Sequence, residues 1–177
     1  MKQLLKELLR ELDACAEGVQ WVNDKTLEEA WAICHRGDWM LWLYAKLYPD
    51  NIRKITLAKG HCANTVRHLM KDPRSTDAVD AAIAFGEGRI TTEELTHYAG
   101  DAKKAANAAY ECARKGNDPY GAGAYAAYTA YTATIYTDVD YADATAANAA
   151  DIYAAYTITR KQNRQLTAEL CRKYLTL

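Results

Sequence analysis

Aromatic and charged residues close to position 40 form the first group that could bind a ligand. Trp39 and Trp42 are three residues apart, so their indoles lie near one face of a helix. Arg36 and Asp38 stand at the turn that leads into this helix. Together they can form an aromatic wall with a charged rim, which suits a small ligand or a partner surface. The alternative, which we favour, is a tryptophan-rich core in which Asp38 is the helix N-cap.

A second group of polar residues lies further along the chain. His61, Asn64 and His68 share one helical face. The two histidines are two turns apart, about 10 Å by helix rise, which is too far to bind one metal ion without other ligands. The sequence has no HExxH or CxxC motif, so we expect no metal and no cofactor. A structural or solvent-facing role is favoured for both histidines.

The cysteines do not form a recognisable nucleophilic site. Cys34 is followed and Cys62 preceded by a histidine, but neighbouring residues on a helix point about 100° apart, which is poor geometry for proton transfer. A pair of Cys62 with the distant His97 stays open as an alternative. GxSxG and phosphate-binding glycine loops are missing from the sequence, so no enzyme is predicted. Five widely spaced cysteines are more typical of free buried thiols than of disulfides.

The elements that position these residues are predicted to be helices. Proline and glycine are sparse and separate long segments with helical periodicity. Helix starts are indicated by Thr26 with Glu29, by Thr91 with Glu94 and by Asp72 before a proline. We expect helices over residues 2–17, 27–36, 39–48, 51–70, 73–85, 92–115, 122–137, 139–159 and from 160 onward. This predicts an all-α compact bundle of about eight or nine helices.

The second half of the chain differs in composition. Alanine is dense between residues 99 and 155, where tyrosine also recurs, and this favours close helix packing with tyrosines in the core over an exposed tyrosine interface. Residues 116–159 contain no Lys or Arg, and their charged residues are Asp118, Asp138, Asp140, Asp143 and Asp151. Basic residues follow from Arg160 onward. An internal salt-bridged contact and a complementary subunit interface both fit this pattern.

Length and charge limit the classes of protein to which the chain can belong. The 177 residues predict a single domain over 1–177, with a subdivision near 88–92 as the alternative. Lys and Arg total 22 against 23 Asp and Glu, which argues against general nucleic-acid binding. The longest apolar stretch, 39–45, is far shorter than the ~20 residues of a membrane helix. The N-terminus is charged throughout, so we expect a cytoplasmic protein without a membrane partner.

Four stretches carry a resemblance to a known family. They are the segments 31–34 (WAIC), 37–43 (GDWMLWL), 55–63 (ITLAKGHCA) and 81–91 (AAIAFGEGRIT). In this order they resemble the Imm5-like family of immunity proteins, which includes phage-encoded relatives. The resemblance implies an all-helical, non-secreted protein of biological conflict that acts by binding and is not an enzyme. It supplies no catalytic residue, and the high tyrosine content departs from the family pattern.

The resemblance implies a protein that neutralises a protein toxin or a host defence protein. The alternative is a sponge that sequesters a nucleotide-type immune signal in a pocket at the interface of a homo-oligomer. In that case Trp39, Trp42 or the tyrosines would stack on the base, and Arg36, Arg67 or Arg74 would hold the phosphates. The predicted ligand- or partner-binding residues are Arg36, Asp38, Trp39, Trp42, His61, Arg67 and Arg74.

Overall fold

The chain folds into packed helices, as the sequence predicts. The computed structural model describes residues 5–116, 122–135 and 160–177, and these ranges contain nine α-helices and one short 3-10 helix but no strand. The elements are α1 (Leu5–Glu11), α2 (Ala16–Val22), α3 (Leu27–Ile33), α4 (Gly37–Leu47), α5 (Ile52–Asn64), η1 (Arg67–Leu69), α6 (Pro73–Gly86), α7 (Thr92–Lys115), α8 (Ala122–Thr134) and α10 (Arg160–Tyr174). The all-α bundle is thus confirmed.

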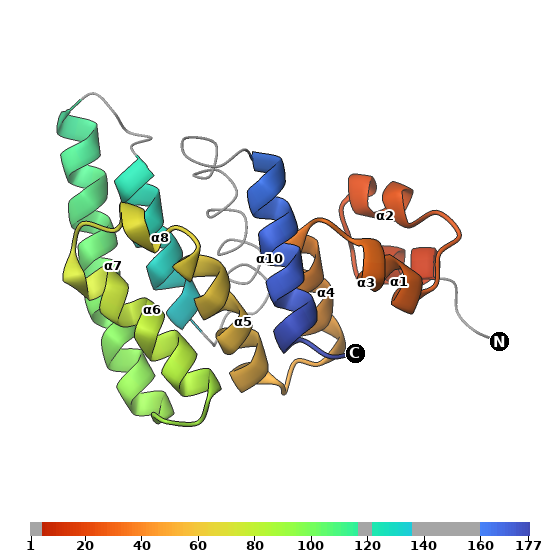
Figure 1. Cartoon of the computed structure of the whole chain (residues 1–177), viewed down its shortest axis with the longest axis horizontal. Helices are drawn as coiled ribbons and strands as arrows, with labels where there is room; N and C mark the ends of the chain where they lie inside the picture. Colours follow the sequence, from red (N-terminus) through yellow and green to blue (C-terminus); the bar gives the residue numbers. More distant parts are fainter. Residues whose placement is uncertain (1–4, 117–121, 136–159) are drawn as a thin grey trace.

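The helices form two groups joined through the middle of the molecule. Figure 1 shows the short helices α1–α3 at one end, α6–α8 at the other, and α10 beside α4 and α5 between them. Helices α6 and α7 pack on one another across the turn at 88–92, with Phe85 and Leu95 in a shared cluster. In the described part of the chain, every helix is too short or too polar to span a bilayer.

Two predictions fall outside the described residues. One is the helix over 139–159. The other is the acidic face of residues 116–159, whose members are Asp118, Asp138, Asp140, Asp143 and Asp151.

Three helix starts follow the local signals in the sequence. The backbone N–H of Glu29 donates to the Thr26 hydroxyl at 3.2 Å, and the Thr26 N–H donates to the Glu29 carboxylate at 2.8 Å. Thr91 and Glu94 make the same reciprocal pair at the start of α7. Asp72 accepts a hydrogen bond from the backbone N–H two residues on and caps α6. These signals predict correctly because each involves atoms within one turn of helix.

The predicted helix over 2–17 is wrong, because the segment forms two helices. Helix α1 ends at Glu11, and Asp13 takes a left-handed conformation with φ 57°. The Cys15 thiol then accepts a hydrogen bond from the Gly18 N–H and caps α2. The turn folds α2 back on α1, so that apolar residues of both helices enter one cluster. Burial of both apolar faces outweighs continuation of a single solvent-exposed helix.

The predicted helix over 51–70 also ends early. Helix α5 stops at Asn64, and the Thr65 hydroxyl donates to the carbonyl of Cys62 at 2.7 Å. A side chain that satisfies a carbonyl of the last turn competes with helix continuation. The chain therefore proceeds through η1 before α6 begins.

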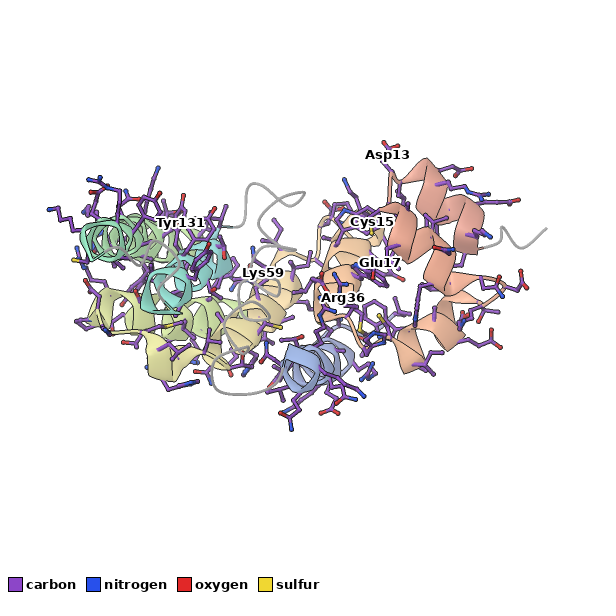
Figure 2. The ribbon with its side chains drawn as sticks, turned by 90° about the horizontal axis from the view of Figure 1, so that it is seen from above. Asp13, Cys15, Glu17, Arg36, Lys59 and Tyr131 are labelled. Carbon is purple, nitrogen blue, oxygen red and sulfur yellow. The ribbon has the colours of Figure 1, made fainter. Side chains whose placement is uncertain are left out.

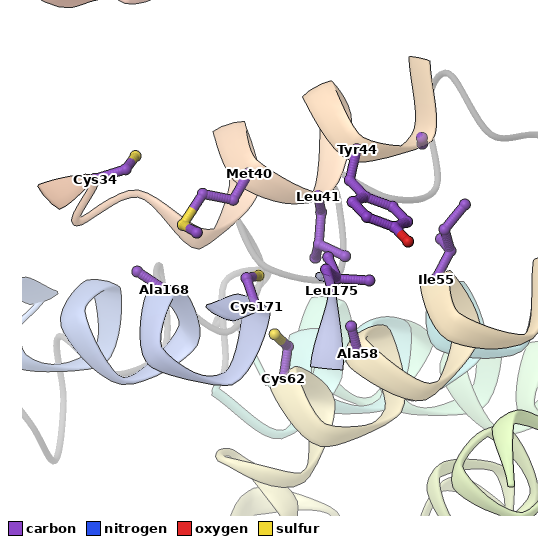
Figure 3. Close-up of a cluster of buried hydrophobic side chains, with 11 residues drawn as sticks. Cys34, Met40, Leu41, Tyr44, Ile55, Ala58, Cys62, Ala168, Cys171 and Leu175 are labelled. Atoms are coloured by element: carbon purple, nitrogen blue, oxygen red, sulfur yellow. The ribbon is translucent and has the colours of Figure 1, made fainter. Parts of the chain in front are cut away.

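The main core lies where α10 meets α4 and α5 (Figure 3). Its fully buried members include Met40, Leu41, Tyr44, Ile55, Ala58 and Leu175. Three cysteines, Cys34, Cys62 and Cys171, are also buried here, whereas Cys15 and Cys112 are exposed. All five are free thiols, as expected, but burial holds for only three.

Two of the buried thiols, Cys34 and Cys171, have raised pKa values. Burial raises the pKa of Cys34, and a hydrogen bond with Cys62 together with burial raises the pKa of Cys171. The Cys171 thiol also lies 3.5 Å from the carbonyl oxygen of Gly37, to which it donates. Cys34 and Cys171 therefore stay protonated at neutral pH and act as small apolar side chains.

The second core, between α5, α6, α7 and α8, is built from alanines. Its fully buried alanines are Ala63, Ala78, Ala82, Ala102, Ala130 and Ala133. The prediction of core tyrosines in this half of the chain holds in part. Among the described residues, Tyr131 packs against this core and Tyr125 against the neighbouring cluster of Val66 and Ala126, whereas Tyr110 and Tyr128 are exposed. Small residues let the helix axes approach closely, and two of these four phenol rings are left at the surface.

The buried side chain of Lys59 binds the C-terminal end of α8. Lys59 is 1% exposed, and its ammonium group donates to the carbonyl oxygen of Ile135 at 2.6 Å. A cation at this position interacts favourably with the partial negative charge at a helix C-terminus. The contact ties α5 to α8 through a residue that the sequence places on an otherwise apolar face.

Substitution of Gly37 should separate α10 from α4. A Cβ atom at Gly37 would lie 2.5 Å from the hydroxyl oxygen of Thr167 and 2.8 Å from its backbone carbon. We expect Gly37→Ala to lower the free energy of unfolding by about 1–3 kcal/mol. Gly100→Ala is the control: it lies inside α7 with open space around it and should stabilise by about 0.5–1 kcal/mol. Urea unfolding measures both, and equal effects would contradict the close contact.

Candidate functional site

A pocket of about 360 Å³ lies between α4 and the short helices α1–α3. All four tryptophans of the chain line it: Trp21 from α2, Trp31 from α3, and Trp39 and Trp42 from α4. Most of the remaining lining is apolar and comes from leucines and other aliphatic residues of α1 to α4. A concave apolar site of this size is typical of ligand pockets and of pockets that receive a side chain.

Packing between the helices sets the orientation of the indoles. The ring centroids of Trp21 and Trp39 are 6.0 Å apart with an interplanar angle of 62°, an edge-to-face arrangement. Trp31 packs against Tyr44 of the main core, with 6.2 Å between centroids. All four indoles are half-buried, so they connect the pocket with the core and with solvent.

An ion pair lies at the edge of the pocket. The Arg36 guanidinium donates to both carboxylate oxygens of Asp38, at 2.8 Å from Nε and 2.5 Å from Nη2. The two side chains are 11% and 7% exposed. Arg36 also lies over the ring of Trp39, 4.4 Å from its centroid, and 3.7 Å from the carboxylate of Glu17. Figure 2 shows Arg36, Glu17 and Cys15 close to one another in this part of the molecule.

The prediction that Asp38 is the N-cap of the helix is wrong. Helix α4 begins one residue earlier, at Gly37, and Arg36 occupies the cap position without a side-chain cap. Asp38 therefore lies in the first turn, where the helix dipole favours a negative charge. The planar fork of Arg36 matches the carboxylate and takes the place of a backbone N–H as its partner.

Helix α10 anchors one wall of the pocket. Arg172 donates to the carbonyl oxygens of Cys34, at 2.7 Å, and of Trp31, at 3.4 Å. These carbonyls lie at the end of α3, where no further helical turn satisfies them. The guanidinium thus links the short helices to the main core.

The predicted binding residues fall into two sets. Arg36, Asp38, Trp39 and Trp42 come together at the pocket. The other three, His61, Arg67 and Arg74, do not line it. Arg67 donates to both oxygens of Asp80, at 2.6 and 2.8 Å, on the surface.

The remaining two predicted residues also have structural partners. Arg74 pairs with Asp72 at the start of α6, with 2.7 Å between Nη2 and the carboxylate. His61 stacks on Tyr174 of α10, with the ring centroids 4.1 Å apart and the planes nearly parallel. Burial, and then the charge of Lys173, lower the pKa of His61.

Sequence reasoning did not find three residues of the site: Trp21, Asp13 and Cys15. They lie on α2 or in the turn before it, and they reach the pocket only because that turn folds α2 against α1 and α4. A tryptophan in a short amphipathic segment carries no local sign of this arrangement. The unusual number of tryptophans before residue 43 was the one available signal.

Two further candidates are not supported by the geometry. The first is the pair of Cys62 and His97. The Cys62 thiol is fully buried, whereas the His97 side chain is 78% exposed and lies 3.6 Å from Asp101, so Cys62 and His97 do not share a proton. Within the residues described, no group of three or more His, Cys, Asp or Glu is placed to hold a metal ion.

Removal of the Asp38 carboxylate should lower the free energy of unfolding more than removal of an equivalent carboxylate at the surface. Asp38→Ala removes the carboxylate that accepts two hydrogen bonds from the largely buried Arg36 guanidinium, and we expect a loss of about 3 kcal/mol in the free energy of unfolding. Asp80→Ala breaks an equally bidentate pair that is solvent-exposed and should cost at most about 1 kcal/mol. Urea unfolding of the two variants measures the difference. Equal losses near 1 kcal/mol would show that the Arg36–Asp38 pair is not buried in solution.

His61 should make the fold less stable in mild acid. Its pKa is lowered in the folded chain, so the unfolded chain binds a proton first as the pH falls below about 6.5. The free energy of unfolding should therefore decrease from pH 7 to pH 5. His61→Phe keeps an aromatic ring against Tyr174 and should flatten this dependence. An unchanged pH profile in this variant would contradict the assignment.

Compared with protein-family models, curated proteins and solved structures, the chain shows no match. The tryptophan pocket and its ion pair are therefore the basis of the function that we propose.

Proposed function

We propose that the protein is a non-enzymatic, cytoplasmic binding protein that neutralises another protein, a toxin or a host defence component, and that the partner inserts a side chain into the tryptophan pocket. The observation that carries the proposal is the convergence of all four tryptophans on one concave site. Tryptophan is enriched among the few residues that dominate the binding energy of protein interfaces.

The surroundings of the pocket also fit an interface. Asp13, Cys15 and Glu17 are exposed around an apolar interior, which resembles the polar rim and apolar centre of a protein interface. Trp21 packs edge to face on Trp39, and Trp21 and Trp42 pack on the apolar cluster of α1–α3, so little conformational freedom would be lost on binding.

The chemistry of the lining supports binding over turnover. The pocket lining includes no histidine or lysine that could act as a general base. Its one buried thiol, Cys34, has a raised pKa and is a poor nucleophile. The Asp38 carboxylate is already engaged by Arg36.

A nucleotide-type ligand has less support. The indoles could stack on a base, but no Lys or Arg lines the pocket to hold phosphates. Of the predicted phosphate ligands, Arg67 and Arg74 are paired with carboxylates away from the pocket, and Arg36 is paired with Asp38 at its edge. We therefore favour a protein partner over the sequestration of a nucleotide signal.

Affinity capture with paired variants tests the proposal. Trp42→Ala enlarges the pocket, and Tyr98→Ala removes an exposed aromatic ring on α7 as the matched control. From cells that carry the partner, we expect the wild-type protein and Tyr98→Ala to retain the same polypeptide and Trp42→Ala to lose it at least tenfold. Circular dichroism must show that both variants stay folded.

Co-expression then tests neutralisation. The captured polypeptide should inhibit growth or trigger a defence response, and the wild-type protein, but not Trp42→Ala, should relieve the effect. Retention of the partner by folded Trp42→Ala would overturn the role of the pocket.

A further inference from the structure

The charged residues on the lining of the tryptophan pocket are carboxylates, Asp13 and Asp38. Asp38 is matched by Arg36, which donates to both of its oxygens. Asp13 lies outside this pair and is exposed, so it is the lining carboxylate that a ligand can reach.

The indole faces at this site interact with cations. Arg36 lies 4.4 Å from the centroid of the Trp39 ring, and the Lys25 ammonium lies 5.4 Å from that of Trp21. The negative face of an indole attracts positive charge, more strongly when both are shielded from water. A cationic side chain of a ligand can make the same kind of contact with another indole of the lining.

Apolar surface makes up most of the pocket, so a bare, hydrated ion is a poor match. The matching group combines a hydrocarbon stem, which displaces water from the leucines and indoles, with a positive charge near the opening. Lysine and arginine side chains have this construction, and arginine in addition stacks on aromatic faces.

We propose that the side chain bound in the pocket is cationic, an arginine or lysine of the protein partner. The inference rests on the proposed function, because it names the group that occupies the same site. Its stem lies against the indoles and leucines, and its charge lies beside the exposed carboxylate of Asp13. This positive charge complements the carboxylate of Asp13.

Two small probes of equal shape test the charge. n-Butylguanidinium reproduces the end of an arginine side chain, and n-butylurea is its neutral counterpart of nearly the same size. Because every tryptophan of the chain lines this pocket, each indole N–H signal in a nitrogen-15 spectrum and the whole tryptophan fluorescence report on it.

We expect n-butylguanidinium to bind at millimolar concentration and at least tenfold more tightly than n-butylurea. Asp13→Asn removes one lining charge at an exposed position and should weaken the guanidinium severalfold while leaving the urea unchanged. Asp80→Asn, which alters an ion pair away from the pocket, should change neither.

The outcomes separate this inference from the proposed function. Equal binding of the two probes, or a loss of both in Asp13→Asn, would overturn the cationic side chain while the pocket remains a binding site. Absence of binding by both probes would also overturn it, and capture with Trp42→Ala would then decide the proposed function independently. A guanidinium preference that is lost in Asp13→Asn alone supports the proposal.

Discussion

Helix α4 packs into two hydrophobic clusters at the same time, one on each side. Met40, Leu41 and Tyr44 pack into the core with α5 and α10, while Trp42 and Leu43 pack against α1–α3. The helix has 11 residues, so both contacts are made within about three turns. A shift of α4 that improved one cluster would open the other. The tryptophan pocket lies along this shared helix, and its shape is therefore set by the main core as well as by the short helices.

The three short helices depend on this constraint. Each has seven residues, too few for a stable helix in isolation, and their contacts with α4 and with each other hold them. Arg172 adds hydrogen bonds from α10 to the end of α3. The buried pair of Arg36 and Asp38 lies at the same junction, where each charge needs the other. One wall of the pocket is therefore α4, which is fixed in the main core. The other walls are the short helices α1–α3, which are stable only through their tertiary contacts.

Sequence reasoning was accurate where the determining atoms are close in the chain. The capping boxes at Thr26 and Thr91 and the start of α6 after Asp72 were predicted correctly because a single helical turn contains both partners. The position of Asp38 before Trp39 predicts a cap, because nothing in the sequence indicates that Arg36, two residues earlier, takes the carboxylate. The grouping of Trp39 with Trp42 followed from helical spacing. The approach of Trp21 did not, because it depends on how α2 folds back over α1.

The position of α10 in the main core has a consequence for synthesis on the ribosome. Cys171 donates to the carbonyl of Gly37 across 134 positions of sequence. At the usual rate of about 5–20 residues per second, the apolar face of α4 waits roughly 7–27 s for the helix that covers it. Met40 and Leu41 lack their partners from α10 during this interval, although α5 is already made. The main core is therefore completed late in translation, when α10 emerges.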